Sequence, residues 1–144
     1  AKAIWMDQDL ARFAKRYGVP LESNPHFPIN TLPLMRGATA FKGTDRFMPY
    51  CEAIFHAMWV EPQNLGEPVV LASTLRAANF DPEEFLTLIS CQEVKDALRQ
   101  ATESAVARGA FGAPTFFANG EMHFGQDRLD FVEEAIQAEE GQRA

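Results

Sequence analysis

The stretch Arg108-Gly-Ala-Phe-Gly-Ala-Pro-Thr-Phe-Phe117, continued by Asn119-Gly120 and Glu121-Met-His-Phe124, decides the fold class of this chain. Asn-Gly between two apolar runs is the strongest short signal for a β-hairpin, because both turn residues must adopt a positive φ. We therefore expect strands over 114–118 and 121–124. The first of them is apolar at successive positions, which is typical of a strand that is covered on both faces.

A hairpin of this kind needs further strands. Two strands alone rarely sustain a sheet in water, and the remaining sequence shows no other strand pattern. We expect the missing strands to precede residue 1, so that the chain is the C-terminal part of a longer α/β protein. The alternative is a hairpin that packs on helices alone.

Helical patterns fill the remainder of the chain. Apolar residues recur at helical spacing from Trp5 to Tyr17, and Gly18-Val-Pro20 ends that helix. The Pro-rich residues 21–28 are expected to form an extended loop. Two further helices are expected before residue 60, one from Asn30 or Thr31 to about Lys42 and one from 43–45 to about 59. Three more are expected over 69–79, from Asp81 onward and from Ser90 to 109. A last helix is expected after the hairpin.

Local signals support two of these helix starts. Asp81-Pro-Glu-Glu84 combines an N-cap residue, Pro at the first helical position and acids in the first turn. Ser90, with Glu93 three residues later, has the pattern of a capping box. In the helix that ends near 59, we expect one buried apolar stripe, which consists of Phe47, Cys51, Ile54, Phe55, Met58 and Trp59.

Composition narrows the class of protein. The 144 residues are 47% hydrophobic and carry a net charge of −7, which argues against a general nucleic-acid binder. No apolar run approaches the roughly 18 residues of a membrane span, and no signal peptide is present at the start, so we expect a cytoplasmic protein. Residues 1–50 carry a net charge of +3, so an anionic ligand is expected to favour that segment.

The two cysteines, Cys51 and Cys91, are forty positions apart. A long-range disulfide is one option, and we favour the other, two reduced and buried thiols. Their spacing, with no His at a suitable distance, does not predict a metal site.

Taken together, these residues resemble a known family. The stretch 108–117, the Asn-Gly turn and Phe124-Gly-Gln-Asp-Arg-Leu129 look like the second half of a thioredoxin fold. More narrowly, they resemble the 2-hydroxychromene-2-carboxylate isomerases, relatives of the kappa-class glutathione transferases in the DsbA-like group. The isomerase branch is also matched by Lys2 through Tyr17-Gly-Val-Pro20, by Asn24-Pro-His-Phe-Pro-Ile-Asn-Thr31 and by Leu34-Met-Arg-Gly37.

The resemblance implies an α/β, thioredoxin-like fold, here mostly α with a C-terminal β-hairpin and helix. Residues 1–144 would form a single DsbA-like domain that is N-terminally incomplete. Within it, 30–108 would be a helical insertion and 109–144 the C-terminal ββα half. Family members begin with a β-α-β unit whose first loop carries a thiol-activating serine. That segment is absent from this sequence, so no catalytic residue is assigned here.

The resemblance also implies glutathione as a cofactor. The Ala113-Pro114 bond would be cis, and the backbone of Ala113 would pair with the cysteinyl part of glutathione. The segment Phe124-Gly125-Gln126-Asp127 would hold the γ-glutamyl end, since N–H groups gather at a helix start. Lys2 aligns with a lysine that meets the glycyl carboxylate. Without the resemblance, the residues predict only that Asp127 is an N-cap and that Pro114 starts a strand after a trans peptide bond.

The implied substrate is a small aromatic carboxylate. The resemblance implies a homodimer that interconverts 2-hydroxychromene-2-carboxylate and trans-o-hydroxybenzylidenepyruvate. The segment Asn24-Pro-His26-Phe27 is expected to line the aromatic cavity, with Phe27 as a stacking wall and Trp59 at its edge. The alternatives are a kappa-like glutathione transferase, a DsbA-like disulfide oxidoreductase and a non-catalytic helical binding module.

Overall fold

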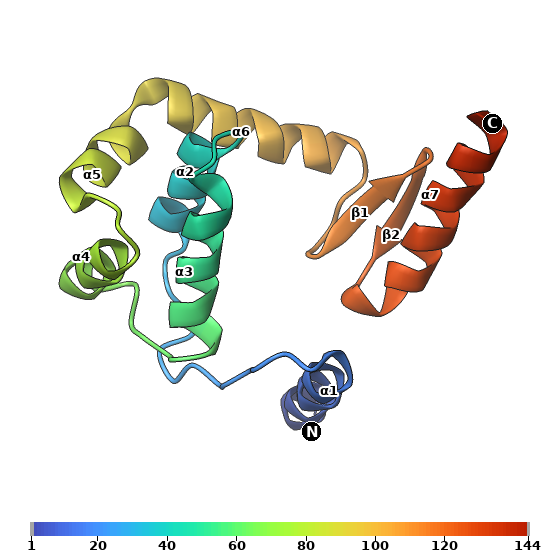
Figure 1. Cartoon of the computed structure of the whole chain (residues 1–144), viewed down its shortest axis with the longest axis horizontal. Coiled ribbons are helices and arrows are strands. Elements are labelled where there is room, and N and C mark those ends of the chain that lie inside the picture. The colour runs from blue at the N-terminus through green and yellow to red at the C-terminus, as the bar shows by residue number, and fades with distance from the viewer. Residues whose placement is uncertain (1, 144) are drawn as a thin grey trace. The chain divides into compact units, whose positions relative to one another are not determined.

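The computed structural model of the chain describes residues 2–143, with side chains placed for residues 5–138. It divides into two compact units, Ala1–Leu98 and Arg99–Ala144, with the boundary inside one helix. The first unit is helical and contains α1 (Lys2–Tyr17), α2 (Leu32–Phe41), α3 (Phe47–Trp59), α4 (Pro68–Ala77), α5 (Pro82–Ser90) and the start of α6 (Gln92–Ala107) (Figure 1).

Several helix ends follow the local signals in the sequence. Gly18 adopts a φ of 66° directly after α1, as expected for a helix-ending glycine. The Asp81 side chain accepts a hydrogen bond from the Glu83 N–H at 2.9 Å, with Pro82 as the first residue of α5. The predicted cap of α5 is therefore confirmed.

The predicted capping box at Ser90 is wrong. Ser90 is the last residue of α5, and α6 begins at Gln92, so Cys91 alone separates the two helices. The Cys91 carbonyl accepts from the Lys95 N–H at 3.2 Å, and its thiol donates to the Glu93 carboxylate. Cys91 therefore occupies the N-cap position that the pattern assigned to Ser90.

The core of the first unit lies where α2 crosses α3 and α5. Tyr50, Leu75 and Phe85 are each 1% exposed, and the Tyr50 hydroxyl donates to the Leu34 carbonyl at 2.8 Å. Burial raises the pKa of Tyr50 far above its ordinary value, so the hydroxyl remains a donor. Gly37 lets α2 approach closely, since a Cβ there would meet the Tyr50 hydroxyl and the Phe85 ring.

The buried face of α3 differs from the predicted stripe. Tyr50, Ile54, Ala57 and Met58 are buried, whereas Phe55 is 64% exposed. Because adjacent helical residues point about 100° apart, a stripe that includes both Ile54 and Phe55 is wider than the face that α2 and α4 cover. The prediction of a buried Phe55 is wrong.

An ion pair joins the starts of α3 and α5. The Arg46 guanidinium donates to both carboxylate oxygens of Glu84, at 2.8 and 3.0 Å, and it lies 4.7 and 4.9 Å from the ring centres of Phe41 and Phe80. This two-point contact lowers the pKa of Glu84. Bidentate geometry and aromatic contacts make the pair more specific than an ordinary surface ion pair.

The second unit contains the predicted hairpin. Strands β1 (Thr115–Ala118) and β2 (Glu121–Phe124) pair antiparallel, with Thr115 opposite Phe124. Asn119 and Gly120 have φ values of 49° and 79°, so the expected Asn-Gly turn is confirmed. The outer edge of β1 has no partner strand within residues 2–143.

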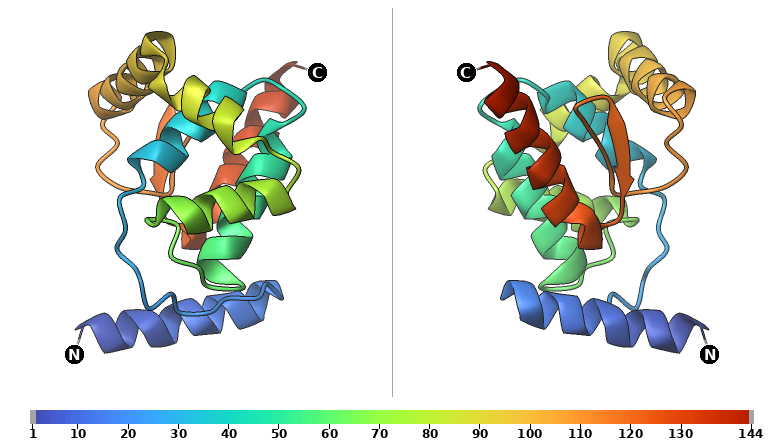
Figure 2. Two further views of the ribbon diagram at one scale, coloured as in Figure 1. Left: turned by 90° about the vertical axis from the view of Figure 1, so that its left-hand side faces the viewer. Right: turned by 90° about the vertical axis from the view of Figure 1, so that its right-hand side faces the viewer.

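Both faces of the hairpin carry packing partners from the second unit. On one face lies α7 (Leu129–Arg143), which follows a short 3-10 helix, η1 (Gln126–Arg128) (Figure 2). On the other face, the Arg108 guanidinium lies 3.6 Å from the centre of the Phe117 ring. This second face remains partly open, since Met122 and Phe124 are 39% and 42% exposed, so the predicted cover is present on the α7 face only.

Both cysteines are free thiols, but they are not both buried. Cys51 is partly buried in α3, and Cys91 is exposed in the joint between α5 and α6. The prediction of two buried thiols is therefore wrong for Cys91, because a residue that alone connects two helices lies at the surface.

Candidate functional site

The turn that enters β1 lies beside the turn that leaves β2. The Pro114 carbonyl accepts a hydrogen bond from the Gly125 N–H at 3.0 Å, so the two segments named by the glutathione prediction are neighbours. The Ala113-Pro114 bond is cis, as the resemblance implied. Ala113 is exposed, and within the described chain neither its N–H nor its C=O has a hydrogen-bond partner.

The turn after β2 is built around Gly125. Gly125 has a φ of 106° and a ψ of 148°, which side-chain-bearing residues rarely adopt. A Cβ at this position would lie 2.5 Å from the Asp127 carboxylate, so that carboxylate folds back over the turn. Asp127 therefore does not cap the helix; its carboxylate pairs with Arg128 at 3.3 Å. The N-cap alternative is wrong.

The resemblance also assigned Phe124, Gln126 and Lys2 to this site. Phe124 is 42% exposed; its ring centre lies 4.6 Å from that of Phe111, and one edge of the ring lies close to Gly112. Gln126 is the first residue of η1 and directly follows Gly125. The side chain of Lys2 lies outside the described residues, although its backbone begins α1.

This part of the second unit can bind an extended peptide. An exposed residue with a free N–H and a free C=O can pair with a peptide as an added strand does. A helix start beside it suits a carboxylate, and the Asp127 side chain suits an ammonium group.

In the first unit, a buried asparagine holds the loop that carries Phe27. Asn24 is 5% exposed, and its side-chain N–H groups donate to the carbonyls of Met58 and Gln63 at 3.0 and 3.1 Å. Its side-chain oxygen accepts from the His26 N–H at 2.9 Å. The loop is thereby tied to the end of α3. Asn24 belongs to the matched motif, but its structural role was not predicted.

A pocket of about 450 Å³ opens next to this loop. The Phe27 and Trp59 rings line this pocket next to each other, with ring centres 5.4 Å apart and ring planes tilted by 53°. His26 is exposed and does not line this pocket. Residues that sequence reasoning missed line the pocket from α1 and the loop, among them Met6, Asp7, Leu10, Leu21 and Glu22.

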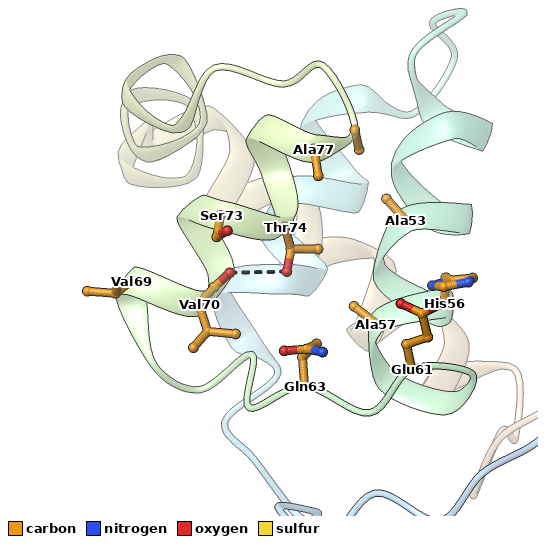
Figure 3. A pocket seen from close by; sticks show the side chains of 11 residues that line it. Ala53, His56, Ala57, Glu61, Gln63, Val69, Val70, Ser73, Thr74 and Ala77 are labelled. Carbon is orange, nitrogen blue, oxygen red and sulfur yellow. Dashed lines mark hydrogen bonds between the residues drawn. The ribbon is translucent and has the colours of Figure 1, made fainter.

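A second groove, of about 620 Å³, lies between α3 and α4 (Figure 3). Small side chains line most of it, with His56, Glu61 and Gln63 at its polar end. It contains none of the residues predicted for a cofactor or substrate.

The Cys51 thiol is poorly suited to disulfide exchange. Burial raises its pKa, which disfavours the thiolate through which disulfide exchange proceeds. The Cys91 thiol donates to the Glu93 carboxylate.

Two further properties concern the described residues only. No group of three His, Cys, Asp or Glu side chains among them could hold a metal ion. No helix among them is long and apolar enough to span a bilayer.

Comparisons with known proteins agree with this architecture. The chain is 29% identical over 141 residues to the 2-hydroxychromene-2-carboxylate isomerase of Pseudomonas sp. strain C18, which covers 94% of this chain and 63% of the relative. It is 26% identical to the human glutathione S-transferase kappa 1, over 91% of this chain and 64% of the relative. The chain thus spans less than two thirds of the curated relatives it matches.

A solved structure is also similar. The structure of a 2-hydroxychromene-2-carboxylate isomerase superposes on 99% of this chain and 69% of its own, with a TM-score of 0.82 and 26% identity. The sequence model of the DSBA-like thioredoxin domain matches residues 1–137. The mostly helical chain with its C-terminal hairpin and helix therefore belongs to the family of DSBA-like thioredoxin domains.

Proposed function

We propose that this chain is part of a glutathione-dependent isomerase that interconverts 2-hydroxychromene-2-carboxylate and trans-o-hydroxybenzylidenepyruvate. The observation that carries the proposal is the exposed, unpaired backbone of Ala113 beside the Gly125–Asp127 turn. Support comes from the isomerases to which the chain is similar. Within this proposal, 30–108 is a helical insertion and 109–144 the ββα half of one thioredoxin domain.

The residues present fit glutathione, which is a tripeptide with one ammonium and two carboxylate groups. In the proposed arrangement, Ala113 pairs with the cysteinyl backbone through its own N–H and C=O. The segment Gln126-Asp127 holds the γ-glutamyl end, as the resemblance implies. The Asp127 side chain holds the neighbouring ammonium. The resemblance assigns the glycyl carboxylate to Lys2, whose side chain lies outside the described residues. Gly125 and Pro114 keep the two turns together.

The reaction requires rotation about a carbon–carbon double bond. When bound, glutathione would supply a thiol nucleophile, the chemistry that permits rotation about such a bond. In the second unit, Ala113 and Asp127 bind and orient the tripeptide. In the first unit, the pocket beside Phe27 accepts an aromatic ring. No residue of this chain is proposed to activate the thiol. By resemblance, we further propose a cytoplasmic homodimer.

The proposal predicts that isomerisation depends on glutathione. With purified protein, conversion of 2-hydroxychromene-2-carboxylate, followed by absorbance, should fall to the uncatalysed rate when glutathione is omitted. Oxidised glutathione is the control, because it lacks the free thiol. Equal rates with and without glutathione would contradict the proposal.

A kappa-like glutathione transferase is the second candidate, supported by the similarity to human glutathione S-transferase kappa 1. The two activities differ in their product. A transferase leaves a stable glutathione conjugate, whereas an isomerase regenerates free glutathione after each turnover. Mass spectrometry of the reaction mixture distinguishes them.

A further inference from the structure

The pocket beside Phe27 combines apolar walls with two carboxylates. Met6, Leu10 and Leu21 join Phe27 and Trp59 in its lining, and Asp7 and Glu22 lie among them. A volume of about 450 Å³ is in the range of small-molecule sites, and apolar walls with few polar groups are typical of them.

The position of Glu22 relative to the aromatic rings is set by backbone contacts. The Glu22 N–H donates to the Trp59 carbonyl at 2.7 Å, and the Phe27 N–H donates to the Asn24 carbonyl at 3.1 Å. Asn24 in turn is bonded to the end of α3. Glu22 and Phe27 are therefore held on the same short loop against Trp59.

Among the residues whose side chains the structure describes, the charges that line this pocket are all negative. None of these lining residues is Lys, Arg or His, and neither Asp7 nor Glu22 takes part in an ion pair with a described residue. Of the side chains described in residues 5–50, no basic one lines this pocket, whereas two of the four acids of residues 1–50 do.

We propose that Asp7 and Glu22 determine the orientation of the ligand, so that this pocket receives an uncharged aromatic ring and rejects a carboxylate. The inference rests on the proposed aromatic substrate, whose carboxylate would then point out of the pocket. Two like charges about 4 Å apart in water repel by roughly 1 kcal/mol, or about fivefold in affinity. Two carboxylates together should produce a larger discrimination.

Binding of three probes with the same ring tests this inference without glutathione or turnover. The probes are naphthalen-2-ylmethanol, 2-naphthoate and naphthalen-2-ylmethylammonium, which are neutral, anionic and cationic. Titration of the 144-residue chain, followed at the Trp59 indole N–H by NMR, should show that the alcohol binds at least roughly fivefold more tightly than the naphthoate. The ammonium probe should bind at least as tightly as the alcohol. Added salt should reduce these differences.

Charge-neutral variants provide the control. In Asp7→Asn with Glu22→Gln, the affinity for naphthoate should approach that for the alcohol, while the affinity for the alcohol stays the same. The matched control, Asp9→Asn with Glu61→Gln, removes equal charge outside the pocket and should keep the preference. Equal binding of the alcohol and the naphthoate to the parent chain, an unchanged preference in the first variant, or no binding of the alcohol would overturn the inference. A glutathione-dependent turnover would still stand in each case.

Discussion

Replacing Gly37 by alanine should lower the free energy of unfolding of the helical unit by about 2 to 3 kcal/mol. The added Cβ would lie 2.5 Å from a carbon of the Phe85 ring and closer still to the Tyr50 hydroxyl. Both rings are 1% exposed, so neither can move aside freely. The hydrogen bond from Tyr50 to Leu34 would also be disturbed, and this loss exceeds the gain of about 1 kcal/mol in helix propensity.

Urea denaturation followed by circular dichroism measures this effect. Met35→Ala is the matched control, because Met35 lies on the same helix and is 49% exposed. It should cost less than about 1 kcal/mol. Adding Tyr50→Phe to Gly37→Ala should recover part of the loss by removing the nearest oxygen. A Gly37→Ala chain as stable as its parent would contradict the close crossing of α2 over α3 and α5.

Replacing Asp127 by asparagine should weaken glutathione binding roughly tenfold, or about 1.4 kcal/mol. The carboxylate is proposed to hold the ammonium of the γ-glutamyl group, and the amide removes its charge while keeping its shape. Its side chain is 41% exposed, so solvent screening limits the effect to the lower range for charged hydrogen bonds.

Isothermal titration with glutathione measures the change. Asp130→Asn is the matched control, since it removes the same charge from the first turn of α7 and should leave affinity unchanged. Glutathione without its amino group should bind the parent weakly and be insensitive to Asp127→Asn. If the two variants bind glutathione equally well, the assigned role of Asp127 is wrong.

Local signals predicted the elements whose ends depend on one or two residues. Asn119-Gly120 specified the hairpin turn, and Asp81-Pro82 specified the start of α5, because each signal acts through its own backbone. The cap at Ser90 failed because Cys91, one residue on, occupies the position that the same local pattern describes. Two candidate starts one residue apart are distinguished only by where the preceding helix ends.

Features that depend on long-range contacts were not predicted. The exposure of Phe55 depends on which helices cover α3, and the pattern of apolar residues alone does not specify their directions. The pocket is lined by residues of α1 and by Trp59 at the end of α3. The loop between α1 and α2 is held there by hydrogen bonds from Asn24 to Met58 and Gln63, which lie 34 and 39 positions further along the chain. For the proposed glutathione site, resemblance named Ala113 and Asp127, and the hydrogen bond from Gly125 to Pro114 shows that these two segments are adjacent.

The backbone of Ala113 offers the most direct test of the central claim, which is that glutathione lies along this residue. Amide NMR of the 15N-labelled chain during a glutathione titration reports on the Ala113 N–H itself. We expect the largest shift changes at Ala113 and in the turn from Gly125 to Asp127, saturating with one dissociation constant of millimolar or lower. A folded chain whose Ala113 and Asp127 amides do not respond to millimolar glutathione would contradict the account.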